Sequence, residues 1–375
     1  MCLLDLLELG APGRRACAIL GSEGPLRSAI ADLGVETCVE PTPTAVANLG
    51  DSDRGGGKLG LLTSLARAVP ATWAYGRRLS QRLSALNPAI THSIDMKSHW
   101  LTAWRAAPRS SGVVWHLHDY LSNRPAMSKL LRQAAKNRPD LIAVAVSNSV
   151  ADDAKSVLGS KIRVRTIENG IDLERFQPAT EPKDPHAPIR VGLMATFARW
   201  KGHETFLKAV ALSPTDDASS FAVIGGPIYR SRGSQYSLDE LRALADRLGI
   251  GDRVEFAGHS DRPDETMRSL DVLVHASDRA EPFGRTIAEG MASGKAVITT
   301  GLGGAGELVV DGESALQVPA RDPQALADAI GRLTRDAALR ERLGRAGRAR
   351  ACLRFDRRRL PSQWTAIYDE AAITS

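Results

Sequence analysis

Residues 281–294, EPFGRTIAEGMASG, constrain the fold more than any other part of this chain. They lie between two apolar runs, LDVLVHAS (270–277) and KAVITT (295–300). This order predicts a strand, a loop, a helix and a second strand, which together form the crossover unit of a parallel sheet. Pro282 stiffens the loop, and Gly284 lets another molecule approach the main chain closely. The free N–H groups at the start of the helix then predict an anion site.

Two carboxylates flank the start of this helix. Glu281 lies on the loop and Glu289 lies inside the helix, so both can face one crevice at the carboxyl ends of the strands. Carboxylates repel phosphate, and we therefore expect them to bind hydroxyl groups of a sugar or a ribose. The alternative for either residue alone is a surface glutamate or one that only favours the helix.

Strand and helix patterns alternate along the whole chain, which predicts an α/β fold with parallel sheets. At 375 residues the chain is too long for one ordinary core, so two domains are expected. Residues 178–188, PATEPKDPHAP, are rich in proline and polar side chains and are the best candidate for a linker.

Composition limits which cellular compartment and which binding partners are expected. No apolar run approaches the roughly 20 residues that span a bilayer, and no basic segment precedes the apolar N-terminus as in a signal peptide. The four cysteines have no paired or metal-like spacing, which indicates isolated thiols and a cytoplasmic protein: Cys2, Cys17, Cys38 and Cys352. A net charge of +6 permits an anionic partner, but aromatic residues are only 5% and do not alternate with basic ones, so nucleic acid is not expected.

The run from Glu281 to Val297 resembles the signature of the retaining glycosyltransferases of family 4, which have the GT-B fold. The resemblance extends to GLGGAGELVVDGESALQVPARDPQALADAI (301–330), to WKGHETFLKA (200–209) and to ENGID (168–172). It covers nearly the whole chain and is densest in the second half.

This resemblance implies two Rossmann-like, doubly wound domains that face each other across a cleft. The N-terminal, acceptor-side domain is expected over residues 1–177 and the nucleotide-sugar-binding domain over 189–360. Residues 361–375 are expected to form a helix that crosses back to the first domain. The family begins with a strand and a short glycine-rich loop that have no counterpart here, so we expect about 15 to 20 family residues to be absent. An unusual but complete fold is the alternative.

The resemblance also implies the residues that bind the donor. Lys201 is expected to contact the diphosphate, and the main chain at Phe283 and Gly284 would stabilise the leaving group. The arginine that the family places five residues before this lysine is replaced here by Thr196, which makes Arg199 the candidate for the same phosphates. A solvated basic turn is the alternative for both cations. Glu289 would hold the ribose hydroxyls.

Further candidates come from both halves of the chain. His118, which precedes Asp119 at the end of a predicted strand, would contact the transferred sugar, while His116 is more typical of a core residue. Gly225 and Gly226 would bring main chain near the nucleotide. The pair Gly303 and Gly304 matches a glycine element of the family that begins a helix near the donor.

The function expected from these residues is a metal-independent, retaining transfer of a sugar from a UDP- or GDP-linked donor to a glycan or lipid-linked acceptor. Assembly of cell-surface polysaccharide is the expected setting. His118 and Glu281 are the predicted catalytic residues, no metal site is expected, and the nucleotide-sugar is a co-substrate rather than a cofactor. The alternative is a catalytically impaired or non-catalytic protein of the same fold that binds sugar nucleotides.

Two basic segments raise the question of a membrane. The arginine-rich run 332–359 and the basic helix at 129–138 are most simply solvated faces. The alternative is attraction to an anionic membrane surface or a charged glycan, with the protein peripheral at the inner face of the membrane.

Overall fold

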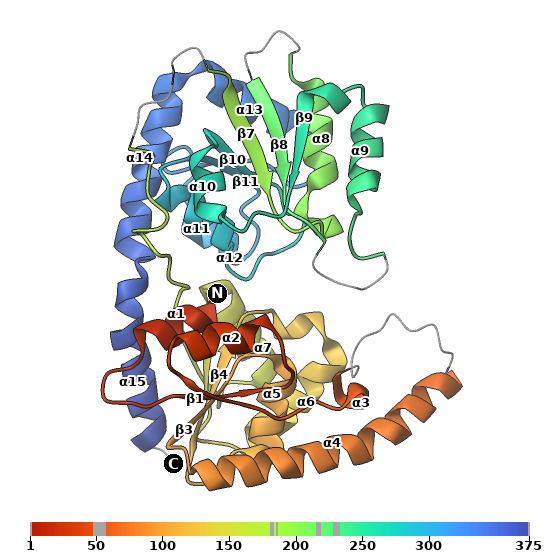
Figure 1. The fold of residues 1–375 in the computed structure, drawn as a ribbon, viewed down its shortest axis with the longest axis vertical. Coiled ribbons are helices and arrows are strands. Elements are labelled where there is room, and N and C mark those ends of the chain that lie inside the picture. The colour runs from red at the N-terminus through yellow and green to blue at the C-terminus, as the bar shows by residue number, and fades with distance from the viewer. Residues whose placement is uncertain are drawn as a thin grey trace. The chain divides into compact units, whose positions relative to one another are not determined.

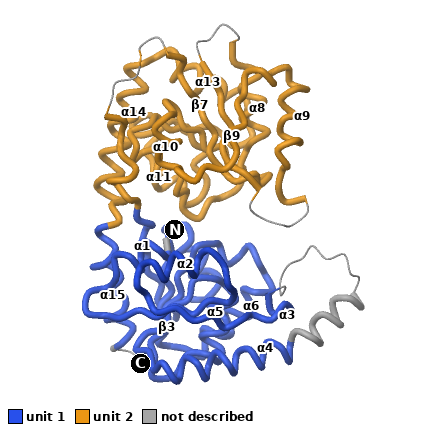
Figure 2. Tube along the Cα trace, in the orientation of Figure 1, with its two compact units in different colours: residues 1–170, 358–375 blue, residues 171–357 orange. Residues whose placement is uncertain are grey.

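The computed structural model describes residues 2–47, 58–180, 184, 187–214, 219–227 and 233–373, with only the backbone described for residues 2, 58–68 and 373. The chain divides into two compact units (Figure 2). Unit 1 contains residues 1–170 and 358–375, and unit 2 contains residues 171–357. The predicted linker at 178–188 falls inside unit 2, and part of it lies outside the described residues.

Unit 1 carries six parallel strands and eight α-helices among its described residues (Figure 1). The strands are β1 (Cys17–Leu20), β2 (Glu36–Val39), β3 (Ile90–Ser93), β4 (Gly112–Leu117), β5 (Ile142–Ala145) and β6 (Arg163–Thr166). The helices are α1 (Cys2–Leu9), α2 (Pro25–Asp32), α3 (Thr44–Ala47), α4 (Lys58–Leu86), α5 (Met96–Leu101), α6 (Pro125–Lys136), α7 (Asn148–Leu158) and α15 (Leu360–Ile373), with short turns η1 (Thr102–Ala106) and η2 (Leu121–Asn123).

The strands of unit 1 form two sheets rather than one. The order β3-β4-β5-β6 makes a four-stranded sheet, and β1 pairs only with β2. Strands β4 and β5 are buried along their whole length, whereas no described residue of β1 or β2 is fully buried. The single doubly wound sheet that the sequence predicts is therefore interrupted in this unit, because no described strand joins β1 to β3.

The β1–β2 pair brings two of the cysteines close together, although Cys17, Cys38 and Cys352 are free thiols as predicted. Parallel pairing brings Ile19 opposite Cys38, so that Cys17 and Cys38 become close neighbours although 21 residues separate them. Burial raises the pKa of the Cys17 thiol, and Cys38 raises it further. Spacing along the chain gave no sign of this pair because the register of two strands decides it.

Helix α15 belongs to unit 1 although it ends the chain. Its apolar side chains Leu360, Trp364 and Ile367 are buried in one cluster with Val114 of β4 and Ile142 of β5. The final helix therefore completes the core under the four-stranded sheet.

Unit 2 is one doubly wound unit with a six-stranded parallel sheet (Figure 1). Its strands are β7 (Ile189–Met194), β8 (Ser219–Ile224), β9 (Val254–Gly258), β10 (Val272–His275), β11 (Ala296–Thr299) and β12 (Leu316–Gln317). Its helices are α8 (His203–Leu212), α9 (Leu238–Arg247), α10 (Pro263–Arg268), α11 (Arg285–Ala292), α12 (Gly304–Leu308), α13 (Pro323–Arg335) and α14 (Ala337–Arg354), with short turns η3 (Arg199–Lys201) and η4 (Gly251–Arg253); a further turn, η5 (Arg357–Arg359), lies where the two units join.

The strand order β12-β11-β10-β7-β8-β9 places the first strand of the unit beside its fourth. The chain winds outward from β7 in one direction and from β10 in the other, so the switch of direction lies between these two strands. Both faces of the sheet are covered. Val272 and Val274 belong to the core formed with α8 and α13, whereas Leu273 points to the opposite face and contacts Gly290 of α11. This explains why β10 is apolar throughout.

Helix starts follow from capping residues that the sequence contains. Ser237 and Glu240 form a reciprocal capping box at α9, and Asp322 with Pro323 begins α13. Asp336 caps α14 in the same way. None of the helices within the described ranges is both long and apolar enough to cross a membrane.

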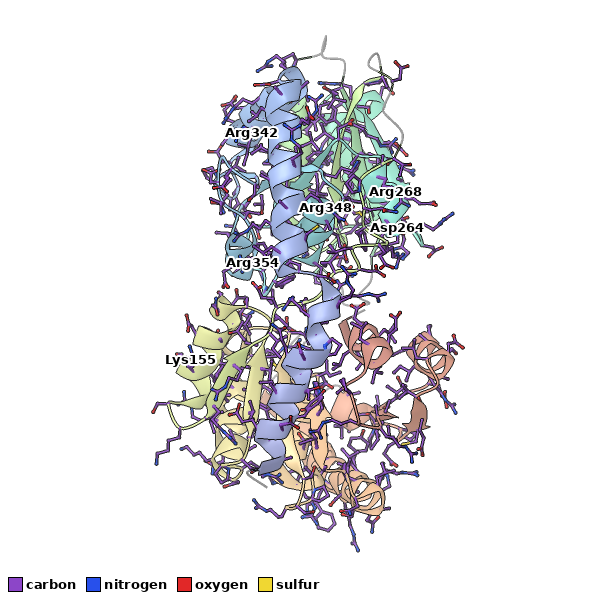
Figure 3. All side chains as sticks on the ribbon, turned by 90° about the vertical axis from the view of Figure 1, so that its left-hand side faces the viewer. Lys155, Asp264, Arg268, Arg342, Arg348 and Arg354 are labelled. Atoms are coloured by element: carbon purple, nitrogen blue, oxygen red, sulfur yellow. The ribbon has the colours of Figure 1, made fainter. Side chains whose placement is uncertain are left out.

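The arginines of α14 do not form a purely solvated face. Arg348 donates to the carbonyl oxygens of Phe176 and Ala292 at 2.9 and 2.5 Å. Arg354 donates to the carbonyl oxygen of Glu307 at 2.8 Å. Figure 3 shows Arg342, Arg348 and Arg354 spaced along this helix. Much of the basic run therefore binds carbonyl oxygens within unit 2.

This contact pattern predicts unequal effects of two arginine substitutions on α14. Arg348→Ala removes both carbonyl contacts and should lower the free energy of unfolding by about 1–3 kcal/mol. Arg345→Ala removes only an ion pair with Glu341 whose side chains are 68% and 67% exposed, so the change should stay below about 0.5 kcal/mol. Urea unfolding of both variants measures the difference, and equal losses would contradict the structural role of Arg348.

Candidate functional site

The predicted site residues of unit 2 gather at the carboxyl edge of its sheet. Lys201 follows β7, and Glu281 follows β10, the two strands that flank the switch of direction. Loops after such neighbouring strands diverge to opposite faces and leave a crevice between them, which is where doubly wound sheets bind ligands. The topology therefore explains why residues 80 positions apart meet.

Glu281 is the centre of this cluster. Its side chain is buried, and its Oε1 atom forms an ion pair with the Lys201 ammonium. The same oxygen accepts a hydrogen bond from the Ser277 hydroxyl at 2.7 Å and lies 3.1 Å from Nε2 of His275. Three donors from two strand ends thus converge on one carboxylate.

One arrangement of hydrogens satisfies the whole network. If Nε2 of His275 carries the proton, it donates to Glu281, and Nδ1 then accepts from the hydroxyl of Thr299, 3.3 Å away. The Thr299 hydroxyl in turn accepts from the main-chain N–H of Gly301 at 3.1 Å. Strand β11 thus fixes the orientation of the His275 ring through Thr299.

These donors keep Glu281 ionised. Burial alone would raise the pKa of its carboxyl, but the hydrogen bond and the charge of His275, together with the charge of Lys201, outweigh burial and lower the pKa to about 2. A carboxylate with this pKa is a hydrogen-bond acceptor at any physiological pH. It is too weakly basic to take a proton from an alcohol.

Two glycines allow the loops to approach each other. Gly202, with a φ of +78°, follows Lys201, and a Cβ atom there would lie only 1.9 Å from the carbonyl oxygen of Ala276. Gly225, with a φ of +142°, would bring a Cβ atom equally close to the carbonyl oxygen of Ala195. Both positions exclude any side chain. Gly202 brings the loop after β7 against the loop after β10 and so sets the reach of Lys201 toward Glu281.

The second predicted carboxylate lies inside α11. Glu289 is buried, and its Oε1 atom is 3.3 Å from Nε of Arg285, one turn earlier. Gly284 precedes the helix in the left-handed conformation, with a φ of 97°. Phe283 is buried, and its ring packs edge-on against the ring of Phe355. This contact holds the loop against the end of α14.

The glycine pair also lies beside Glu281. The main-chain N–H of Gly304 donates to the carbonyl oxygen of Glu281 at 2.8 Å, and Gly303 forms a parallel bridge with Glu281. The structure therefore brings Gly303, Gly304, Lys201 and Glu281 together. Gly226 lies next to β7, because its carbonyl oxygen accepts from Phe197 N–H at 3.1 Å.

Arg199 points elsewhere. Its guanidinium donates to Glu240 at 2.7 Å and to the carbonyl oxygen of Gly233 at 2.9 Å, and it lies over the ring of Tyr236. It lines an open pocket of about 380 Å³ together with Trp200, Lys208, Arg279 and Arg321. The structure does not bring Arg199 to Glu281, and its role in donor binding stays a prediction.

His118 belongs to unit 1, at the carboxyl end of β4. It is half-buried, and its ring centroid lies 4.0 Å from that of His116. Burial lowers the pKa of His116 well below its ordinary value, and burial likewise lowers the pKa of His92 to about 3, so both rings are neutral. His118 is thus the outermost member of a row of histidines whose inner members are uncharged.

Reasoning from the sequence missed three members of this network. Ser277 and His275 contact Glu281, and Thr299 orients His275, but none of the three carries a motif of its own. A usable signal was present, since a histidine at the carboxyl end of a buried strand lies on the ligand edge of the sheet. Among the side chains that the structure describes, no three His, Cys, Asp or Glu residues gather closely enough to hold a metal ion.

The lowered pKa of Glu281 predicts a pH-dependent stability. The stabilisation from the ionised Glu281 is fully present above pH 4.5, the unfolded value, and is lost progressively as the pH falls to about 2, the folded value. The total loss should reach about 3 kcal/mol in the free energy of unfolding. Urea unfolding of the native protein and of Glu281→Gln at about pH 7, 4 and 3 tests this. The difference between the two should shrink as the pH falls, and a constant difference would contradict the assignment.

Comparison with known proteins bears on both units. A model described as Glycosyl transferases group 1 matches residues 178–350, and one described as Glycosyltransferase Family 4 matches residues 29–175. The D-inositol 3-phosphate glycosyltransferase of Corynebacterium urealyticum is 30% identical over 261 residues, which cover 64% of this chain and 60% of that protein. The lipopolysaccharide core biosynthesis mannosyltransferase LpsB of Rhizobium meliloti is 28% identical over 301 residues, which cover 72% and 82%. The chain spans less than two thirds of the first relative's length.

A solved structure matches nearly the whole chain. Anabaena Alr3699/HepE in complex with UDP superposes with a TM-score of 0.79 at 21% identity, covering 98% of this chain and 95% of that one. The same protein has also been solved with UDP-glucose. Likeness at this identity shows the fold, and it confirms the predicted GT-B architecture of two parallel α/β domains. The two family models match the two halves of the chain, and the chain therefore belongs to the family 4 type of GT-B glycosyltransferases.

Proposed function

We propose that this protein transfers a sugar, with retention of configuration, from a UDP-linked donor to a glycan or lipid-linked acceptor in the assembly of cell-surface polysaccharide. The observation that carries the proposal is the buried, ionised Glu281, held by Lys201, His275 and Ser277 at the switch point of the second sheet. Family membership supports transferase activity, and the UDP and UDP-glucose complexes of HepE favour UDP over GDP.

Lys201 suits the diphosphate. Its ammonium carries three protons, of which one is directed to Glu281, and its position over the Trp200 ring, 4.2 Å away, leaves it only 19% exposed. A partly desolvated ammonium stabilises negative charge more strongly than one in water. We assign to it the charge that develops on the departing nucleotide. The transfer would then need no metal ion, because Lys201 and the main-chain N–H groups near Phe283 and Gly284 would perform that role.

Glu281 would orient the donor sugar rather than react with it. Its low pKa makes it an acceptor for sugar hydroxyl groups and a poor base. Retention would follow from attack on the face that the nucleotide leaves, with the departing phosphate accepting the proton of the acceptor hydroxyl. Glu289 would bind the ribose hydroxyls, and His118 of unit 1 would contact the transferred sugar.

Nucleotide binding is the first test of the donor class. By calorimetric titration UDP should bind more tightly than GDP, and Glu289→Ala should weaken UDP binding by about 1–3 kcal/mol through loss of charged hydrogen bonds. Glu313→Ala, an exposed glutamate in the same unit, is the matched control and should leave UDP affinity unchanged. A folded protein that binds neither nucleotide would overturn the proposal.

A second candidate is a protein that binds sugar nucleotides without turnover. Two observations favour it: Thr196 stands where the family has an arginine, and Arg199 is engaged by Glu240 instead of facing Glu281. The diphosphate site would then hold one cation where related enzymes use two. Binding alone does not separate the two candidates, but turnover does.

Release of UDP from UDP-glucose, with water as the default acceptor, measures turnover directly. The native protein should release UDP, and Glu281→Gln should reduce the rate by about 100-fold or more while UDP affinity changes by less than about threefold, because Glu281 acts on the sugar. Glu313→Gln should match the native rate. Tight UDP binding without any release in the native protein would favour the non-catalytic candidate.

A further inference from the structure

Unit 1 contains one strongly basic segment. Residues 58–112 contain eight Lys or Arg residues and a single acidic residue, Asp95, which gives a net charge of +7. The other strongly basic segment is the run 332–359, with eleven arginines and three acidic residues. Asp95 is itself engaged as the N-cap of α5, where it accepts from the N–H groups of Lys97 and Ser98. The segment comprises α4, α5 and η1 and belongs entirely to unit 1.

Helix α4 has one face in the core and one face outside. Tyr75, Leu79 and Leu83 are buried in a cluster with Leu101 and Ala106. The outward face carries Val69, Trp73 and Arg77 at intervals of four residues, with Val69 65% and Trp73 46% exposed. Figure 1 shows α4 along the outside of unit 1. An exposed valine and tryptophan one turn apart are not required by the core that this helix completes.

Two neighbouring elements extend the exposed aromatic surface. Trp104 of η1 is 37% exposed, lies against Gly76 of α4 and stacks on Trp100 of α5 with 4.7 Å between ring centroids and 6° between planes. The guanidinium of Arg105 lies over the ring of Trp73 at 4.8 Å. We call this surface the tryptophan face; it consists of Val69, Trp73, Arg77, Trp100, Trp104 and Arg105. It contains three of the six tryptophans of the chain.

We propose that the tryptophan face docks on an anionic phospholipid bilayer. Tryptophan prefers the boundary between headgroups and acyl chains, where its apolar ring and its polar N–H are both satisfied. Arginines beside it would contact lipid phosphates, with their apolar stems along the rings. The positive charge of residues 58–112 adds attraction to anionic headgroups at this face. In the other basic run, 332–359, several arginines instead donate to carbonyl oxygens within unit 2.

The ring geometry favours lipid over an acidic glycan. A tryptophan that binds a sugar presents an open ring face for stacking. Here Trp100 covers one face of Trp104, and Arg105 lies over Trp73. The exposed Val69, one turn from Trp73, adds an apolar contact that suits acyl chains rather than sugar hydroxyl groups.

This inference adds a location to the proposed function but does not depend on it, because the tryptophan face shares no residue with the Glu281 cluster. Its test is vesicle binding, which needs neither donor nor acceptor. The protein is sedimented with vesicles of phosphatidylcholine alone or with about one third phosphatidylglycerol. Binding should require the anionic lipid, and acyl chains that carry bromine should quench tryptophan fluorescence on binding.

Two pairs of substitutions separate charge from insertion. Arg77→Gln with Arg105→Gln should weaken binding about 25-fold, since each arginine near an anionic surface contributes about fivefold. Trp73→Ser with Trp104→Ser should strongly reduce the quenching by brominated chains, because only the partly covered Trp100 of this face then remains. The matched control is Arg332→Gln with Arg335→Gln, two exposed arginines of α13 in the basic run, which should leave vesicle binding within about twofold. An unchanged urea unfolding transition in each variant shows that the fold is intact.

The proposal is overturned by any of three results. The first is that the native protein fails to bind anionic vesicles. The second is that the α13 control weakens binding as much as the variant of the tryptophan face, which would make the attraction a property of overall charge. The third is that brominated acyl chains do not quench tryptophan fluorescence. Binding to an acidic polysaccharide that is lost in the tryptophan variant, without binding to vesicles, would assign the same face to a glycan instead.

Discussion

The structure of unit 2 depends on how the negative charge of one buried carboxylate is stabilised. Removing Glu281 from water disfavours its charged form, and a buried carboxylate without partners would become protonated. Here Lys201, Ser277 and His275 offset that cost, and each comes from a different position along the loops after β7 and β10. The charged form is thereby fixed before any ligand arrives, and an active site gains from such preorganisation.

The surrounding fold supplies the means of this compensation. The switch of direction between β7 and β10 separates their loops, and Gly202 then lets the first loop contact the second at Ala276. Strand β11 contributes Thr299, which orients His275, and the chain that follows β11 contributes Gly303 and Gly304. The arginines of α14 act farther out, where they bind carbonyl oxygens and hold the chain segments around α11. Several of these arginines thus bind main-chain oxygens of the unit itself.

Much of this could be predicted from sequence because it is local. The strand–loop–helix–strand unit around residues 270–300 follows from apolar runs and the position of Gly284, and the pairing of Glu281 with a glycine turn follows from motifs of the family. The partners Ser277 and Thr299 could not be predicted, since their role depends on which loops meet in space. The same holds for Arg199, whose direction is set by Glu240 on a helix some 40 residues later.

Unit 1 shows a different limit of prediction from the sequence. Its helices and strands follow the predicted pattern, but the break between β1–β2 and β3–β6 is a matter of pairing, which periodicity does not encode. The tryptophan face could not be predicted from the sequence either, since Trp73 lies on α4 and Trp104 on η1, about 30 residues later. Whether tryptophans and arginines share a face depends on the packing of α5 and η1 against α4.

The most direct test of the central claim is the titration of the Glu281 carboxyl by NMR. Protein labelled with ¹³C at the side-chain carboxyl of glutamate is compared with Glu281→Gln to assign the signal, and its shift is followed as the pH is lowered. The structure predicts that Glu281 remains ionised down to a pKa of about 2. A midpoint at or above the ordinary value of about 4.3 would show that the donors do not outweigh burial, and the account of the site would fail.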